Sequence, residues 1–145
     1  MRRGEIHNRG RKQQILDFSG LLLGKITPTD IDGLIEYHNK LFILMEAKYG
    51  SAPLPFGQKL ALERLCDSLD KDKPSIIFIS RHILPSENDV DMSETLVDCY
   101  YWKGRWEKVC KNIKLGDAIK GFISKNSHHQ SKELSKQSKK NGNVQ

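Results

Sequence analysis

The stretch of residues 41–49 constrains the fold most, because the five apolar residues 41–45 are followed at once by Glu46-Ala47-Lys48. A continuous apolar run of this length predicts a strand that is buried on both faces where it begins. Strand side chains alternate between faces, so Leu44, Glu46 and Lys48 share one face. Burying a charge costs several kcal/mol unless it is paired or coordinates a metal. The charged end of this strand therefore needs partners.

The segment before this strand supplies more acidic side chains. Residues 31–37 alternate as a strand, and residues 38–40 form a turn that makes the two strands antiparallel neighbours. Asp30 and Asp32 share a face and precede or begin the first strand. If the pairing register allows, these two carboxylates converge with Glu46 and the Lys48 ammonium on a patch a few Å wide. Either Asp30 or Asp32 can then be the principal ligand of a cation.

The remaining pattern predicts an α/β protein with a mixed central sheet flanked by helices. Helices are expected at residues 8–18, 58–69 and 115–123, and further strands at 21–23, 76–79, 94–102 and 105–109. The strand at 21–23 is expected to be buried, and the last two strands to turn at Lys103-Gly104. We expect one domain over residues 1–124 and a disordered basic tail over 125–145, since that tail is rich in Ser, Lys, Asn and Gln.

Positive charge gathers at the two ends of the chain. The formal net charge of the 145 residues is +6. Residues 1–12 carry five basic side chains and one acidic one, and residues 125–145 repeat that balance, which leaves a net charge of −2 over residues 13–124. Basic ends suit phosphate contacts, and solvated charge is the equal alternative. Arg9, Arg11 and Lys12 are the candidate contacts to a nucleic-acid backbone.

Several classes of protein are disfavoured by composition. The longest apolar runs fall far short of the ~20 residues that a membrane helix needs, and no apolar signal segment follows the charged N-terminus. The three cysteines are widely spaced and form no zinc motif. Free thiols favour a reducing compartment. We therefore expect a cytoplasmic protein with no membrane partner.

Carboxylates beside an ammonium have the composition of a hard-cation site. Mg²⁺ prefers oxygen ligands and is often held by one or two carboxylates together with a substrate phosphate, and Mn²⁺ suits similar ligands. Such an ion promotes attack on a phosphodiester by activating water and stabilising negative charge. An adjacent lysine orients the water or stabilises the developing charge. The residues thus favour phosphodiester hydrolysis.

Asp32, thirteen intervening residues and then Glu46-Ala47-Lys48 resemble the PD-(D/E)XK nuclease superfamily, which includes restriction enzymes, Holliday-junction resolvases and RecB-like nucleases. The amino-acid sequence of residues 29–35 and 44–50 is especially similar to that of small phage-encoded nucleases, and the resemblance covers roughly residues 8–80. It implies a restriction-endonuclease-like fold, with Asp32, Glu46 and the Ala47 carbonyl as Mg²⁺ ligands and Lys48 as the catalytic lysine.

The resemblance also implies roles for two further residues. At one place the sequence departs from the pattern of the family. In RecB-like members a glutamine of the following helix supports the site, and Gln58 stands in that place, facing the sheet. The departure concerns the "PD" element, because Pro28 is followed by Thr29. Asp32 is favoured as the principal ligand for its distance from Glu46, and Asp30 is kept as a supporting or second-metal residue.

Other polar and aromatic residues have plainer explanations beside their functional ones. Glu5 is expected at the surface more than in a metal site, Asp17 is as readily a helix-end or loop contact, and His38 is a solvent-facing turn residue. Arg64 lies beside Glu63 and Lys59, which suggests ordinary surface pairing. Aromatic residues of the last two strands are able to stack on bases, but we expect them in the core: Tyr100, Tyr101, Trp102 and Trp106.

The sequence thus predicts a Mg²⁺-dependent DNA endonuclease, phage-borne and acting in a bacterial host cell. We expect the enzyme either to select DNA by its structure, for example branched or nicked DNA, or to cut DNA without specificity. Cutting both strands would require a homodimer. Two alternatives are weighed against it. One is a catalytically silent nuclease-fold protein that binds nucleic acid, and the other is a protein that binds host machinery.

Overall fold

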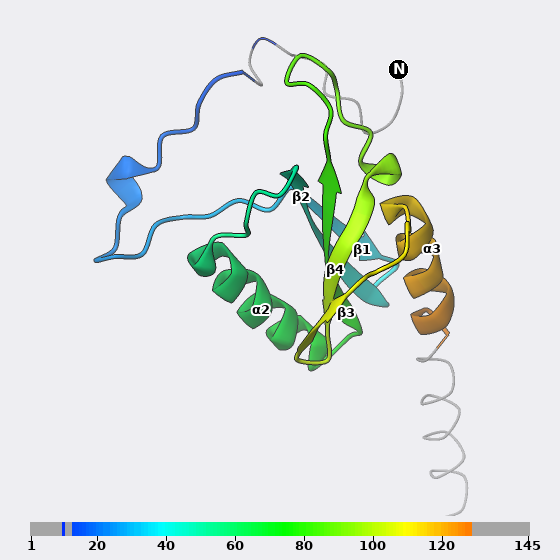
Figure 1. Ribbon diagram of the computed structural model, residues 1–145. Coiled ribbons are helices and arrows are strands. Elements are labelled where there is room, and N and C mark those ends of the chain that lie inside the picture. The colour runs from blue at the N-terminus through cyan, green and yellow to red at the C-terminus, as the bar shows by residue number, and fades with distance from the viewer. Residues whose placement is uncertain (1–9, 11–12, 129–145) are drawn as a thin grey trace, which may run out of the picture. The chain divides into compact units, whose positions relative to one another are not determined.

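The computed structural model describes residue 10 and residues 13–128. The chain divides into two compact units, residues 1–30 and residues 31–145, and each is described by itself. The second unit holds the sheet and the two helices α2 (Phe56–Asp70) and α3 (Leu115–Asn126). It has an α/β fold, as the sequence predicts (Figure 1).

The N-terminal unit differs from the sequence prediction. Residues 13–18 are not helical, and the first regular element after them is the short 3-10 helix η1 (Ser19–Leu21). The predicted buried strand at residues 21–23 is wrong, because its three leucines are exposed and Leu23 pairs only with Ile26 across a tight turn. Gly24 has a φ of +62° in that turn, a conformation that glycine adopts without strain. A run of three leucines indicates that burying these side chains would be favourable. It does not identify the strand with which the run would pair.

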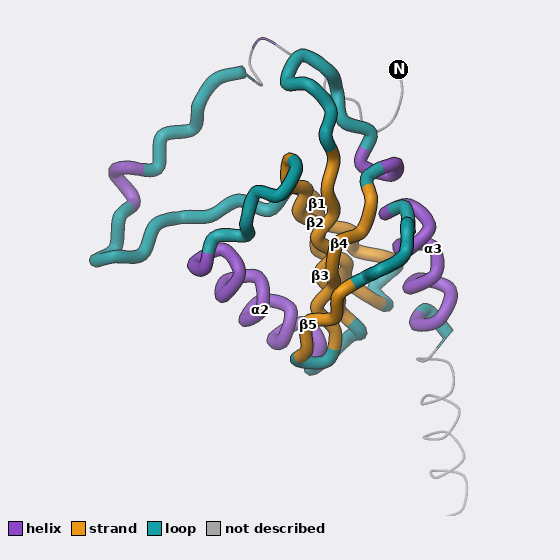
Figure 2. Tube along the Cα trace, in the orientation of Figure 1, coloured by secondary structure: helices purple, strands orange, loops and turns teal. Residues whose placement is uncertain are grey.

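Five strands form one mixed sheet in the order β1-β2-β3-β4-β5 (Figure 2). The strands are β1 (Gly33–Tyr37), β2 (Leu41–Tyr49), β3 (Ser75–His82), β4 (Leu96–Trp102) and β5 (Arg105–Lys108). Only the pair β2 and β3 is parallel, since α2 connects them, and the other neighbours are antiparallel. The bounds of β2 match the prediction, and β3 is longer than the predicted strand at 76–79.

Two tight turns join the antiparallel pairs where the sequence predicts them. His38 and Asn39 have positive φ angles of 47° and 58°, and the Lys40 N–H donates to the Tyr37 carbonyl over 2.8 Å. Lys103 and Gly104 also have positive φ, between β4 and β5. Such turns match the twist of paired strands, and Asn and Gly tolerate them best. The first turn fixes the register in which Gly33 lies opposite Met45.

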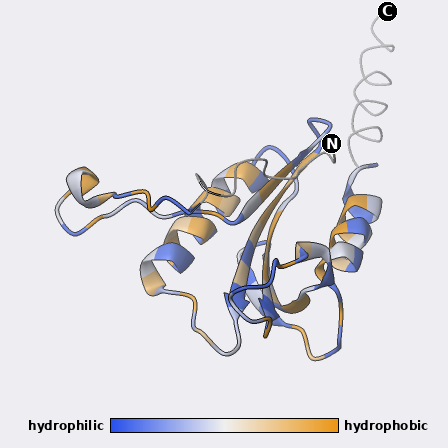
Figure 3. Cartoon of the chain, turned by 90° about the horizontal axis from the view of Figure 1, so that it is seen from above, coloured by the Kyte–Doolittle hydropathy of each residue, from blue (hydrophilic) through white to orange (hydrophobic). Residues whose placement is uncertain are grey.

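The helices cover opposite faces of the sheet, as Figures 1 and 3 both show. On the α2 face, Leu62 and Cys66 pack against strand residues such as Leu44 and Ile77. On the α3 face, Leu115 and Phe122 pack against a separate set of strand residues. The alternation of β2 therefore divides its side chains between two cores, as predicted.

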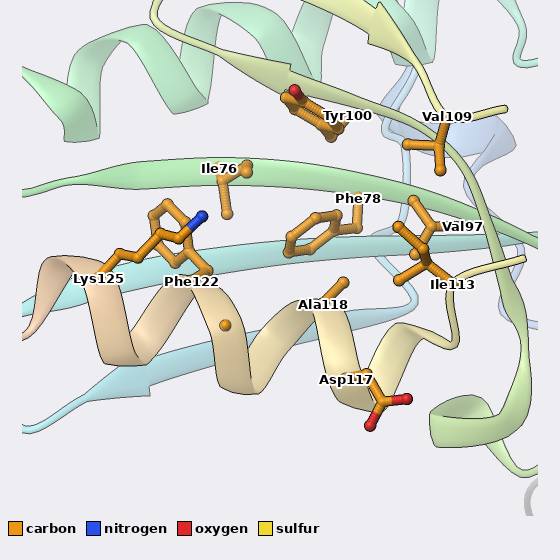
Figure 4. Close-up of a pocket in the computed structure, with 11 residues that line it drawn as sticks. Ile76, Phe78, Val97, Tyr100, Val109, Ile113, Asp117, Ala118, Phe122 and Lys125 are labelled. Carbon is orange, nitrogen blue, oxygen red and sulfur yellow. The ribbon is translucent and has the colours of Figure 1, made fainter. Parts of the chain in front are cut away.

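The α3 face also contains a largely apolar cavity of about 390 Å³, drawn in Figure 4. Phe78 and Tyr100 contribute from the sheet, and Ala118 and Phe122 from the helix, while Lys125 lies at one end (Figure 4). The small residues of α3 leave this space open, since a Cβ added to Gly121 would meet nothing within 4 Å. This cavity lies on the face away from Glu46 and Lys48.

The end of the described chain corrects the predicted tail boundary. Lys125 and Asn126 belong to the last turn of α3, where the Asn126 side chain donates to the Phe122 carbonyl over 2.9 Å. The remainder of the predicted tail, from residue 129, lies outside the described residues. Within the part of the chain that the structure describes, no helix is long and apolar enough to cross a membrane.

Candidate active site

Glu46 and Lys48 lie on the α2 face near the carboxyl end of β2, where the sequence places them. The Glu46 side chain is 2% exposed and that of Lys48 is 19% exposed. The Lys48 ammonium lies 3.7 Å from Glu46 Oε2. The apolar start of the strand anchors both residues, since Leu44 on the same face is fully buried. The strand thus holds a buried carboxylate and a partly buried ammonium beside each other.

Asp32 immediately precedes β1 and hydrogen-bonds to this part of β2. Its backbone N–H donates to Glu46 Oε1 over 3.0 Å, and its Oδ2 accepts the Ala47 N–H over 2.8 Å. The hairpin register explains the meeting, because Gly33 lies opposite Met45 and the next residue back lies beside Glu46. Two carboxylates are therefore held together by reciprocal hydrogen bonds across the strand pair.

Burial and the Asp32 carboxylate shift the pKa of Glu46. Burial, and next the neighbouring Asp32 carboxylate, raise the pKa of Glu46 to about 7, although the Asp32 N–H and the Lys48 ammonium favour its charged form. The Lys48 ammonium at 3.7 Å lowers this pKa by less than burial and Asp32 raise it. A strongly shifted pKa of this kind is typical of functional sites.

Gln58 completes the group from the first turn of α2. Its side chain is 8% exposed, and its Oε1 accepts a hydrogen bond of 3.0 Å from Lys48 Nζ. Helix α2 begins after Pro55, shortly beyond the end of β2, so Gln58 faces the strand that carries Lys48. Lys48 is consequently fixed between an amide oxygen and a carboxylate. The prediction that Gln58 faces the sheet is confirmed.

The donor set fits a hard divalent cation. Asp32 and Glu46 offer carboxylate oxygens, and burial and Asp32 disfavour the charged form of Glu46, which added positive charge would favour. A strand residue directs its N–H and C=O toward the same neighbour, so the Ala47 carbonyl faces the edge on which its N–H meets Asp32. A metal ion at this edge would supply that positive charge.

The sequence predicts three converging carboxylates, and the structure brings two of them together. Among the described residues, no group of three or more His, Cys, Asp or Glu side chains is placed to hold a metal. Asp30 is exposed and belongs to the N-terminal unit, which is described by itself. Asp32 is therefore the acid that the structure brings to Glu46, and a supporting role of Asp30 stays a prediction.

Arg81 is a residue of this region that the sequence reasoning missed. It lies beside Lys48 in the parallel register of β2 and β3. Its Nη1 donates to the carbonyls of Gly50 and Ala52 over 3.1 and 2.7 Å, and its Nε lies 3.0 Å from Asp98 Oδ2. Arg81 thereby holds the loop that connects Lys48 to α2. Its position in β3, two residues after the apolar run of residues 76–79, was the available signal.

The other candidate residues divide between described and undescribed parts of the chain. Arg9, Arg11, Lys12 and Glu5 lie outside the described residues, so their roles stay predictions. Asp17 makes the local loop contact, accepting the Ser19 N–H over 2.9 Å. His38 is an exposed turn residue, as predicted. Glu63 beside Arg64 pairs with Lys59, whose Nζ lies 2.7 Å from Glu63 Oε1, and the surface pairing of Arg64 itself stays a prediction.

Comparison of the chain with protein-family models, with curated proteins and with solved structures finds no match in any of the three. The functional interpretation therefore rests on the geometry of Asp32, Glu46, Lys48 and Gln58.

Proposed function

We propose that the protein is a Mg²⁺-dependent DNA endonuclease with a restriction-endonuclease-like fold of the PD-(D/E)XK type. One observation carries the proposal: Asp32, Glu46, Lys48 and Gln58 form one connected group on a single sheet face. Glu46 is a buried carboxylate whose pKa is raised to about 7, first by burial and next by the neighbouring Asp32 carboxylate. A divalent cation and a phosphodiester are the partners whose charges suit the group.

Each side chain has a defined part in phosphodiester hydrolysis. Asp32, Glu46 and the Ala47 carbonyl would hold the Mg²⁺ ion. When bound, that ion supplies Lewis-acid stabilisation of the negative charge on the phosphate and lowers the pKa of water. Lys48 orients the attacking water or stabilises the charge that develops as the phosphorus–oxygen bond breaks. Gln58 keeps the Lys48 ammonium turned toward Glu46.

The proposal extends to the context that the sequence predicts. The substrate is DNA that is branched, nicked or cut without sequence preference, and the basic N-terminal residues Arg9, Arg11 and Lys12 contact its backbone. The enzyme acts in the cytoplasm of a bacterial host as a phage product. Two copies would be needed to cut both strands, since each chain has one such group among its described residues.

The direct experiment incubates the full chain with linear duplex, single-stranded and branched DNA, in Mg²⁺ and in chelator. We expect cleavage in Mg²⁺, its loss in chelator, and substitution of Mn²⁺ for Mg²⁺. Asp32→Asn should abolish cleavage while the circular-dichroism spectrum stays unchanged. Asp72→Asn is the matched control, because that side chain is 82% exposed at the far end of α2. Full activity of Asp32→Asn would contradict the proposal.

A further inference from the structure

A second, smaller cavity lies on the α2 face, beside the candidate active site. Its volume is about 210 Å³, below the ~300–1,000 Å³ typical of pockets for drug-sized ligands and suited to a single ring system. The lining side chains come from the loop before α2, from α2 and from three strands: Leu54, Lys59, Ile79, Arg81, Cys99 and Trp106. Its inner surface is apolar.

The cavity adjoins the active-site group at three points. Ile79 lies opposite Glu46 and Arg81 opposite Lys48 in the register of β2 and β3. Lys59 follows Gln58 on α2. Neighbouring strands lie about 4.8 Å apart, so the backbone of Ile79 and Arg81, which line the cavity, lies one strand spacing from that of Glu46 and Lys48. A chemical group bound in this cavity would need only a short covalent linkage to a phosphate at Glu46.

Trp106 forms an aromatic wall of this cavity and has a fixed orientation. Its indole N–H donates to Glu63, and its ring is backed by Tyr101 at a centroid distance of 5.2 Å. The Lys59 ammonium lies 5.6 Å from the ring centroid. Trp106 is only half-buried, whereas Tyr101 is 6% exposed in the core. The expectation that these aromatics are core residues therefore holds for Tyr101 and is incomplete for Trp106.

The charges around the cavity favour a planar, uncharged occupant. Its two cations already have acidic partners, since Lys59 pairs with Glu63 and Arg81 pairs with Asp98. These pairings leave little net charge at the cavity. A nucleobase combines an aromatic face with hydrogen-bond acceptors at its edge, and it stacks on tryptophan whatever its sequence.

We infer that this cavity binds one unpaired nucleobase of the DNA strand whose phosphate lies at Glu46. The inference rests on the proposed function and deepens it, because it names the substrate class as DNA with a single-stranded element at the cut. In a fully paired duplex the base would first have to leave the stack, which costs a few kcal/mol. Unpaired ends, gaps and branch points avoid that cost.

The test uses the fluorescence of Trp106 in the full chain. The protein has two tryptophans, and the other, Trp102, packs against Phe122 on the opposite face. A Trp102→Phe variant therefore reports on Trp106 alone. It is titrated in chelator, where no cleavage occurs, with a single-stranded oligothymidylate and with a blunt duplex, while the anisotropy of labelled DNA measures binding independently. We expect the single strand to quench the emission and the duplex to leave it nearly unchanged.

Two cysteine variants in the Trp102→Phe background provide the matched comparison. Cys99→Leu fills the cavity without removing Trp106, and Cys110→Leu adds the same bulk at an exposed position outside it. The first should weaken single-strand binding by about 5- to 100-fold and abolish the quenching. The second should change neither. Thermal unfolding of both variants verifies that they fold.

The outcomes separate this inference from the proposed function. Binding of single-stranded DNA without quenching, or unchanged binding by a folded Cys99→Leu variant, overturns the base site and leaves the nuclease assignment standing. Quenching that Cys99→Leu removes, in a protein that cuts no DNA with Mg²⁺, supports the base site and overturns the catalytic assignment. Failure of both DNAs to bind in chelator overturns the base site, while cleavage in Mg²⁺ tests the nuclease assignment separately.

Discussion

The two faces of the central sheet bury different kinds of side chain. The α3 face is packed with apolar residues such as Ile43 and Phe122, and its defect is a cavity of about 390 Å³ (Figure 4). The α2 face has an apolar core of its own, but at one end of β2 it encloses Glu46 and Gln58. The same strand therefore contributes apolar side chains to the core on one face and a buried polar side chain to the other face.

The difference separates a buried group of polar side chains from ordinary surface charge. An exposed ion pair contributes little, with a median near 0–1 kcal/mol, and needs no functional explanation. Glu46 is 2% exposed and has a second carboxylate as its neighbour, an arrangement that disfavours the charged form of Glu46. The α3 cavity lacks such a group of converging acids.

The largest expected effect separates two lysines on opposite faces. Lys48→Met should lower Mg²⁺-dependent cleavage by at least about 10²–10³-fold, because the charge that stabilises the reaction is lost. Lys125→Met, at the rim of the α3 cavity, should leave cleavage unchanged. Rates of single-turnover cleavage measure both. Equal losses in the two variants would contradict the assignment of the reaction to one face.

The second prediction compares packing on the two faces. Leu62 is 1% exposed between α2 and the sheet, so Leu62→Ala should lower the free energy of unfolding by about 2–5 kcal/mol. Ile113 lines the α3 cavity and is 37% exposed, so Ile113→Ala should have an effect smaller than that. Urea unfolding measures both. A larger loss for Ile113→Ala would show that the α3 face is the tighter core.

The third prediction concerns the pH dependence of stability in chelator. Folding raises the pKa of Glu46 from its ordinary 4.5 to about 7, so the folded state holds this proton more tightly. The resulting stabilisation is present below pH 4.5 and is lost as the pH rises through 7, on the order of 3 kcal/mol. Glu46→Gln should remove that dependence.

The control for the pH experiment is Glu36→Gln, an exposed acid on the neighbouring strand β1. Urea unfolding between pH 4.5 and 8 gives the difference in unfolding free energy between each variant and the natural chain. That difference should change with pH for Glu46→Gln and stay level for Glu36→Gln. A level difference for both would mean that Glu46 titrates normally in the folded protein.

The smallest expected effect comes from filling the α3 cavity. Ala118→Leu places apolar volume where Figure 4 shows open space and should stabilise the fold by about 0.5–2 kcal/mol. Cleavage should not change, since the cavity lies on the other face. The midpoint of thermal unfolding and the cleavage rate are the measurements. A fall in the cleavage rate would show that the two faces are coupled.

The sequence predicted the part of the fold in which local pattern and packing agree. The apolar run of residues 41–45 and the turn at residues 38–40 specify both β2 and its register with β1, which is why Asp32 and Glu46 were predicted to meet. Gln58 was predicted on the buried side of its helix because it precedes Leu62 by one turn. These inferences need only short-range periodicity.

The sequence did not reveal features that depend on distant partners. The leucines at residues 21–23 looked like a strand, but no pairing partner could be read from their pattern, and they are exposed. The role of Arg81 depends on two loop carbonyls thirty residues away in the chain and on the parallel register of β2 and β3. Trp106 likewise becomes a cavity wall only through the meeting of three strands with α2.

The central claim is that Asp32 and Glu46 form a cation site, and paramagnetic line broadening by Mn²⁺ tests it most directly. Substoichiometric Mn²⁺ added to isotope-labelled protein should first broaden the amide signals of Asp32, Ala47 and Lys48, and excess Mg²⁺ should reverse this. Asp32→Asn should remove the effect, and Asp72→Asn should keep it. Broadening confined to other surface acids, or unchanged in Asp32→Asn, would contradict the account.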